Sequence, residues 1–178
     1  MPGWLNGAQH PANVKIEIEG TITPAVAKMV IAKLQAAKRR DQRVLIVLDS
    51  CGGDMTSALD LGDAIREASD VAVLARHNCN SAALAVLAAA DHRFAQAGTK
   101  FSFHSASLPT AAIGESANVV ELVRAIGDLR AHDRRFLSKV AGWLGIEPYA
   151  LAKLDHAERT LTARDARAAG IIHEITAP

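Results

Sequence analysis

Three groups of residues with the chemistry of serine acyl transfer follow one another between positions 44 and 104. An apolar run ends in the pair Gly52-Gly53, Ser81 precedes a segment rich in Ala and Leu, and His104 follows Phe103. Backbone N–H groups of glycines can stabilise an oxyanion, a serine hydroxyl can attack a carbonyl, and a histidine can accept the serine proton. Each group alone is a weak signal, but their order along the chain predicts a nucleophilic site.

Short apolar segments predict the strands that would bring these residues together. Residues 14–19 alternate apolar and polar side chains, as a half-buried strand does, and we expect Gly20 to end that strand. Residues 44–48 and 71–74 are continuously apolar, which is typical of parallel strands covered on both faces. Further strands are expected to end at His104 and to cover residues 171–175.

Segments with helical patterns separate these strands. Thr23-Pro24 has the residue types of a helix start, and residues 81–90 are apolar on all sides, which predicts a buried helix opened by Ser81. A shorter helix is expected from Pro148, and residues 162–165 resemble a capping box. A long helix is expected from Ser116. Its predicted buried stripe is Val119, Leu122, Val123, Ile126, Leu129, Phe136, Leu137 and Val140.

The alternation of strands and helices predicts an α/β fold with a parallel sheet and right-handed crossovers. A length of 178 residues predicts one domain spanning residues 1–178, with residues 1–13 as a flexible N-terminus. A hydrophobic content of 49% and a net charge of +1 argue against disorder and against a nucleic-acid-binding surface.

Two cysteines exclude a scaffold built from disulfides, and no segment predicts a signal peptide or a membrane-spanning helix. We therefore expect a cytoplasmic protein with no membrane partner. Cys51 and Cys79 are interpreted as small buried hydrophobes, with a disulfide or redox-sensitive pair as the alternative. No metal site is expected, because no His/Cys pair has the spacing of metal ligands.

Four segments are together similar to a known family. The sequence Asp-Ser-Cys-Gly-Gly at 49–53 stands where that family has Asn-Ser-Pro-Gly-Gly, and residues 80–95 are similar to the segment that holds its nucleophile. His104 falls where its catalytic histidine ends a strand, and residues 158–172 resemble the stretch that holds its third triad member. From about Val14 to Ile175 the chain resembles the Clp proteolytic-subunit family of serine peptidases. The resemblance implies the Clp/crotonase-like fold of repeated ββα/βα units with a mainly parallel sheet.

The resemblance implies hydrolysis of peptide bonds through an acyl-enzyme, without a cofactor. It assigns Ser81 as the nucleophile, His104 as the base and then the acid, and Glu158 as the residue that orients the histidine. The N–H groups of Gly53 and Ala82 would form the oxyanion hole, and Asp155 is the fallback for Glu158. The implied partners are a peptide or protein substrate, further copies of the chain in a homo-oligomeric ring, and an ATPase unfoldase.

Four positions depart from the family pattern. His77 replaces a glycine, Asn80 a small residue, Cys51 a proline and Glu158 an aspartate. His77 and Asn80 could re-shape the site, so a catalytically silent ring subunit stays open as an alternative. His77 is also near enough in sequence to Ser81 to replace His104 as the base. A crotonase-type acyl-CoA enzyme is a further alternative, against which the short chain and the Ser/His pair argue.

Overall fold

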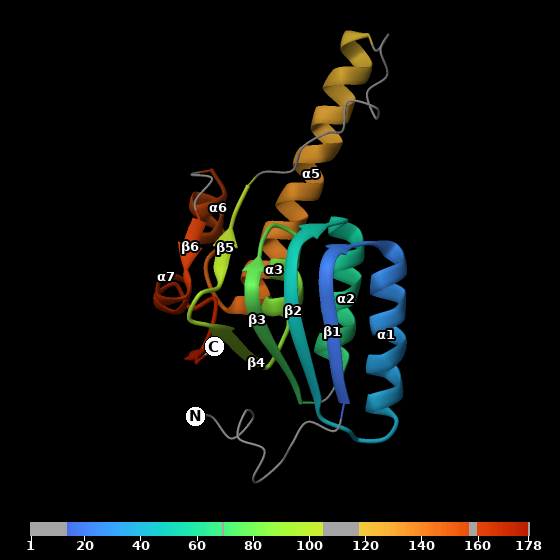
Figure 1. Cartoon of the computed structure of the whole chain (residues 1–178). Helices are drawn as coiled ribbons and strands as arrows, with labels where there is room; N and C mark the ends of the chain where they lie inside the picture. The colour runs from blue at the N-terminus through green and yellow to red at the C-terminus, as the bar shows by residue number, and fades with distance from the viewer. Residues whose placement is uncertain (1–13, 69, 105–117, 157–159, 178) are drawn as a thin grey trace.

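The computed structural model describes residues 14–68, 70–104, 118–156 and 160–177 (Figure 1). The predicted flexible segment 1–13 lies outside the described residues. The strands are β1 (Val14–Ile22), β2 (Val44–Gly53), β3 (Val71–Cys79), β4 (His92–Gln96), β5 (Lys100–Ser102), β6 (Thr160–Thr162) and β7 (Glu174–Thr176). The helices are α1 (Pro24–Lys38), α2 (Met55–Glu67), α3 (Ala83–Ala88), α5 (Val119–Leu144), α6 (Pro148–His156) and α7 (Ala163–Ala168).

The main sheet is parallel, in the order β1-β2-β3-β4-β7. The short strand β5 pairs in parallel with β3 and antiparallel with β6, so it joins the C-terminal elements to the main sheet. This arrangement confirms the predicted α/β class and its mainly parallel sheet. Parallel strands place their carboxyl ends at one edge. At that edge β2 ends in Gly52-Gly53, and the segment that follows β3 carries Ser81.

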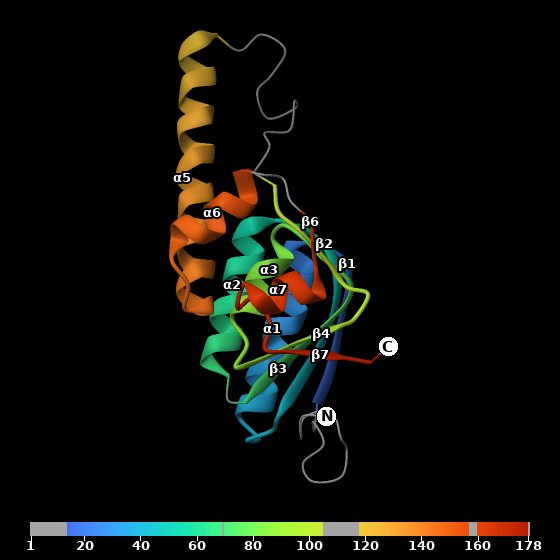
Figure 2. The same cartoon turned by 90° about the vertical axis from the view of Figure 1, so that its left-hand side faces the viewer.

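Helices α1, α2 and α3 cover one face of the main sheet (Figure 2). In β1 the side chains of Ile16 and Ile18 are buried against this layer, whereas Glu17 and Glu19 are exposed, as the alternating sequence predicts. Burial of one such isoleucine contributes about 1.5–3 kcal/mol relative to exposure. Helix α1 begins as predicted, with Thr23 as N-cap accepting a hydrogen bond from Val26 N and with Pro24 in the first turn.

Strand boundaries differ from the sequence-based expectations. Gly20 does not end β1; it has a φ of 78° beside a register shift, and the strand continues to Ile22. Strand β4 was not predicted, because its five residues lack a clear alternating or continuous apolar pattern. Strand β5 ends at Ser102, two residues before His104. The last strand is β7, which begins three residues later than the expected start at Ile171.

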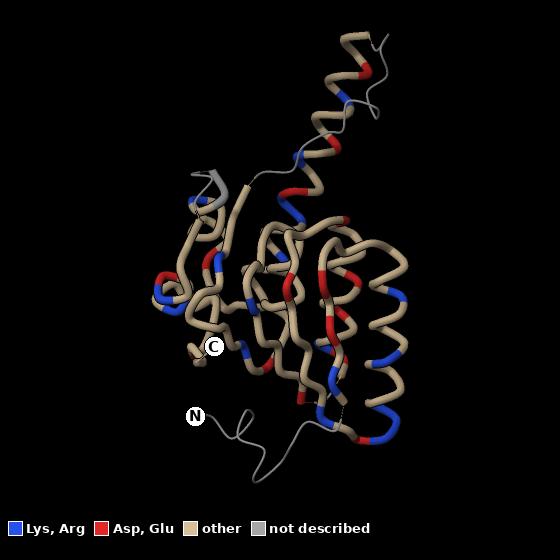
Figure 3. The backbone as a smooth tube through the Cα atoms, viewed as in Figure 1, with Lys and Arg blue, Asp and Glu red and all other residues tan. Residues whose placement is uncertain are grey.

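Helix α5 begins after Asn118, whose side chain forms a capping box with Glu121. The prediction of a buried stripe along its whole length is wrong. Val119, Val120 and Val123 are 74%, 77% and 64% exposed, and the buried residues lie only in its C-terminal half. The reason is that the N-terminal half extends beyond the rest of the molecule (Figure 1). Charges of both signs alternate along the same half (Figure 3).

None of the helices in the described ranges is both long enough and apolar enough to cross a membrane.

Candidate active site

The glycine pair ends β2 in a conformation that requires glycine. Gly52 and Gly53 have φ values of 102° and 145°, which residues other than glycine rarely adopt. A Cβ atom on Gly52 would lie 2.9 Å from Ser81 Cβ and 3.0 Å from Ala82 N. A Cβ on Gly53 would lie 2.3 Å from the carbonyl oxygen of Ile22. The two glycines therefore let the end of β2 pass close to Ser81 on one side and to β1 on the other.

Ser50 fixes this glycine turn, a role that sequence reasoning missed. Its side chain is buried, and its hydroxyl donates to the carbonyl oxygen of Gly20 at 2.5 Å. The same Oγ accepts a hydrogen bond from Gly52 N at 3.1 Å. The N–H of Gly52 is thus engaged within the turn. The only sequence signal for this role is a serine immediately before a Cys-Gly-Gly triplet at the end of a strand.

Ser81 lies in the turn between β3 and α3, and its φ is 51°. This left-handed conformation is uncommon for residues other than glycine and costs about 1–3 kcal/mol, and such strain clusters at functional sites. The expectation that Ser81 opens a helix over residues 81–90 is wrong in detail. Helix α3 spans Ala83–Ala88, and its N-cap position is Ala82. Ser81 precedes the helix because its backbone N–H turns away to donate to Ser102 O at 3.0 Å.

Two groups at this turn have no hydrogen-bond partner among the described residues. One is the hydroxyl of Ser81, which is half-buried. The other is the N–H of Ala82, a residue that is 1% exposed and stands at the start of α3. The N–H groups at the start of a helix have no acceptor within the helix, so this N–H can donate to an oxygen from outside the helix. The turn therefore presents a nucleophilic oxygen and a backbone donor side by side.

Asn80 connects this turn to two other segments. Its Oδ1 accepts a hydrogen bond from Ser102 N at 2.8 Å, and its Nδ2 lies 3.9 Å from Cys51 Sγ. Its backbone N–H donates to Ser50 O at 3.0 Å. The end of β5 is thus held beside Ser81 through both the backbone and the side chain of the turn.

His104 follows the buried Phe103 and is exposed. The hydrogen bonds of Ser102, two residues earlier, bring this part of the chain to the edge that carries Ser81. Within the described residues, His104 and the Ser81 hydroxyl are not hydrogen-bonded to each other. In apo structures catalytic hydrogen bonds are often long and tighten only when substrate binds.

The residue expected to orient His104 is Glu158, which lies outside the described residues. Its fallback, Asp155, belongs to the last turn of α6. The strand after them, β6, pairs antiparallel with β5, and Ser102 Oγ and Thr160 Oγ1 are 3.0 Å apart. The predicted capping box that follows is confirmed, with Thr162 accepting a hydrogen bond from Asp165 N.

His77 contacts Asp49, at a bulge where β3 has three residues opposite one residue of β2. Leu48 pairs with Ala75 and Ser50 with Cys79, so Asp49 faces the segment 76–78. Asp49 Oδ2 lies 2.8 Å from His77 Nδ1, and Asp49 Oδ1 accepts hydrogen bonds from the backbone and side-chain nitrogens of Asn78. The histidine that replaces the family's glycine thus pairs with a carboxylate on the neighbouring strand.

The same contacts change the acidity of Asp49. Burial of its carboxyl group acts to raise the pKa, but the hydrogen bonds from His77 and Asn78 outweigh burial and hold the pKa below its usual range. A carboxyl group with a lowered folded-state pKa stabilises the fold above the unfolded-state pKa of about 4. That stabilisation is lost as the pH falls through the lowered folded-state value.

We therefore expect Asp49→Asn to reduce the free energy of unfolding at pH 6 and to flatten its decline between pH 5 and 2. Urea denaturation at several pH values measures both effects. Asp41→Asn, at an exposed carboxylate away from the bulge, serves as the control. Parallel stability curves for the wild type and Asp49→Asn would show that the contacts of Asp49 do not contribute.

Both cysteines are free, so the alternative of a disulfide is not realised in the structure. Cys79 is buried, as expected for a small hydrophobe, and burial raises the pKa of its thiol, which keeps it protonated and unreactive. Cys51 is exposed, contrary to that interpretation. Its position at the end of β2 leaves its side chain at the surface beside Asn80.

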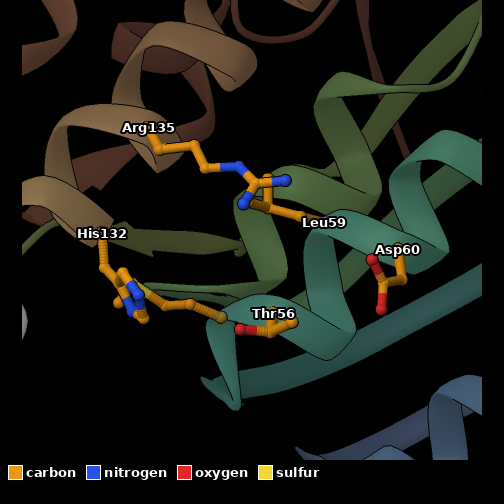
Figure 4. A pocket seen from close by; sticks show the side chains of 6 residues that line it. Thr56, Leu59, Asp60, His132 and Arg135 are labelled. Carbon is orange, nitrogen blue, oxygen red and sulfur yellow. The ribbon is translucent and has the colours of Figure 1, made fainter.

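Two hollows lie away from this turn. One, of about 40 Å³, is formed where His132 and Arg135 of α5 reach toward Thr56 and Leu59 of α2 (Figure 4). The other, of about 390 Å³, lies along α1 beside the start of α2. Neither is lined by Ser81, His104 or the glycine pair.

Comparison with known proteins assigns the family. The sequence model of the Clp protease family matches residues 10–178 of this chain. The chain belongs to the Clp protease family. Its structure is similar to that of a ClpP1 mutant from Listeria monocytogenes, with a TM-score of 0.76 and 21% sequence identity over 92% of this chain and 91% of that chain. This likeness confirms the expected Clp/crotonase-like fold. No curated protein matches the sequence.

Proposed function

We propose that this member of the Clp protease family is a serine peptidase that hydrolyses peptide bonds through an acyl-enzyme. The observation that carries the proposal is the left-handed turn at Ser81. It is packed against Gly52 and hydrogen-bonded to the segment that leads to His104. A structural turn has no need for a strained serine with a hydroxyl that no described residue binds.

In the proposed reaction, Ser81 Oγ attacks the peptide carbonyl carbon while His104 removes its proton. The tetrahedral intermediate collapses, the C–N bond breaks, and His104 returns the proton to the leaving amine. A water molecule, activated by the same histidine, then attacks the ester and releases the acid product and Ser81. No cofactor takes part in these steps.

The N–H groups of Gly53 and Ala82 are proposed to bind the oxyanion. Support for Ala82 comes from its N–H at the start of α3, for which no described residue provides an acceptor. Support for Gly53 over Gly52 comes from Ser50, whose Oγ already accepts the Gly52 N–H. Loss of one oxyanion donor costs about 3 kcal/mol of transition-state stabilisation.

Glu158 is proposed as the residue that orients His104. Strands β5 and β6 run antiparallel and pair Ser102 with Thr160. In the sequence, His104 comes two residues after Ser102 and Glu158 two residues before Thr160. This relation supports Glu158 over Asp155, which precedes it by three positions.

The proposed substrate is a peptide or an unfolded protein, and the proposed assembly is a homo-oligomeric ring with an ATPase unfoldase as a possible partner class. Membership of the Clp protease family supports both. The exposed valines of α5 fit burial against further copies of the chain. The two free cysteines fit a reducing compartment, the cytoplasm.

A catalytically silent ring subunit is the second candidate. It is favoured by the absence of a hydrogen bond between Ser81 and His104 in the described part of the chain. Reaction with a fluorophosphonate probe separates the two candidates, because only an activated serine reacts. We expect one probe per chain, attached at Ser81 and located by peptide mapping. An unreactive protein would support the silent subunit.

A further inference from the structure

The segment that leads to His104 has few bonds to the main sheet. Strand β5 has only three residues, and its pairing with β3 is the single residue pair Asn78–Lys100. At its end, Ser102 forms two hydrogen bonds with the turn that holds the nucleophile. Ser102 O accepts from Ser81 N at 3.0 Å, and Ser102 N donates to Asn80 Oδ1 at 2.8 Å.

The orientation of the Asn80 side chain follows from its partners. A backbone N–H is a donor only, so the atom that faces Ser102 N must be the oxygen Oδ1. The amide nitrogen Nδ2 then faces Cys51 Sγ, a weak acceptor, at 3.9 Å. The strong contact of the Asn80 side chain is therefore with β5, and its weak contact is with Cys51 at the end of β2.

We propose that Asn80 is a positioning residue, which holds the end of β5, and with it His104, at reacting distance from Ser81. The proposal rests on the peptidase function proposed above. A small side chain at position 80 could not reach Ser102 N. Among the described residues, the bond from Ser81 N to Ser102 O would then be the one hydrogen bond left between the turn and the end of β5. Asn80 thus couples the conformation of the nucleophile's turn to the position of the base.

The test compares Asn80→Ala, which loses both side-chain contacts, with Asn80→Asp, which keeps an acceptor for Ser102 N. Asn78→Ala is the matched control, two residues earlier at the end of β3. It loses an amide contact with Asp49 at 3.4 Å, and the Asn78 side chain has no hydrogen bond to Ser102 among the described residues. For each protein we would measure the rate of fluorophosphonate labelling from pH 5 to 9, kcat and KM for a fluorogenic peptide, and the thermal unfolding midpoint.

We expect Asn80→Ala to lower the labelling rate and kcat by about 10- to 100-fold, as misplacement of a catalytic group by about 1 Å does, with KM changed little. The dependence of both rates on pH, which reports the catalytic base, should flatten. Asn80→Asp should restore most of the rate and the pH dependence. Asn78→Ala should behave as the wild type in both respects.

Two results would overturn the inference while leaving the peptidase function intact. One is wild-type labelling and an unchanged pH profile in Asn80→Ala. The other is an equal loss in Asn80→Ala and Asn78→Ala, which would mean general loosening of the turn. If Asn80→Ala does not fold, a normal pH profile in Asn80→Asp still supports the acceptor role, and a flattened profile contradicts it. An unreactive wild-type protein would instead reject the peptidase function, and this inference with it.

Discussion

Replacement of Ser81 by alanine should abolish fluorophosphonate labelling and peptide hydrolysis while leaving the fold intact. The substitution removes one hydroxyl that makes no hydrogen bond to any described residue. A φ of 51° costs alanine and serine a similar amount of energy, so the substitution leaves the backbone strain unchanged. Loss of the nucleophile in a serine peptidase lowers kcat by about a millionfold. Active-site labelling and a peptide assay measure the loss, and the unfolding midpoint measures the fold.

The control is Ser138→Ala, which removes an exposed serine hydroxyl from α5, far along the chain from the turn. It should leave both labelling and hydrolysis at wild-type levels. Hydrolysis that persists in Ser81→Ala at the wild-type rate would exclude Ser81 as the nucleophile. Loss of hydrolysis together with a large fall in the unfolding midpoint would show a structural role instead.

Local patterns were sufficient to predict much of the architecture. The alternation in residues 14–19, the Thr23-Pro24 helix start and the capping box at Thr162 each depend on neighbours in sequence, and the structure confirms all three. The parallel arrangement followed from continuous apolar strands alternating with helices. For helix α5 the sequence was not sufficient, because periodicity predicts an apolar stripe but does not predict whether another part of the molecule covers it. In α5 the apolar stripe extends past the body of the molecule.

At the candidate site, too, the residue types could be predicted from the sequence, whereas the conformation and contacts that depend on the tertiary structure could not. The residue types at Gly52, Ser81 and His104 could be read from the chain, because their chemistry matches that of serine acyl transfer. The left-handed backbone of Ser81 could not be predicted, since it depends on close contact with Gly52 and on a hydrogen bond to Ser102. The pairing of His77 with Asp49 likewise arises from a bulge between two strands, which no local pattern indicates.

Glu158→Gln should reduce kcat by orders of magnitude with little change in stability. In the proposed triad the carboxylate of Glu158 accepts a hydrogen bond from His104 Nδ1, which leaves Nε2 free to accept the serine proton. Glutamine keeps the shape of the side chain but can donate to the ring and favour the wrong tautomer, a change that lowers kcat by about 10⁴ in a related triad. Glutamate has one methylene more than aspartate, so Glu158→Asp tests whether the longer side chain is needed to reach the histidine.

Asp155→Asn is the matched variant, because it neutralises the other carboxylate that precedes β6. With Glu158 in the triad, Asp155→Asn should hydrolyse peptide at nearly the wild-type rate. A severe loss in Asp155→Asn with near-normal activity in Glu158→Gln would assign the orienting role to Asp155 of α6 and exclude Glu158. If neither substitution changes the rate in an active enzyme, neither of these two carboxylates orients His104, and the proposed catalytic group reduces to Ser81 and His104, with Asn80 as a residue that positions the base.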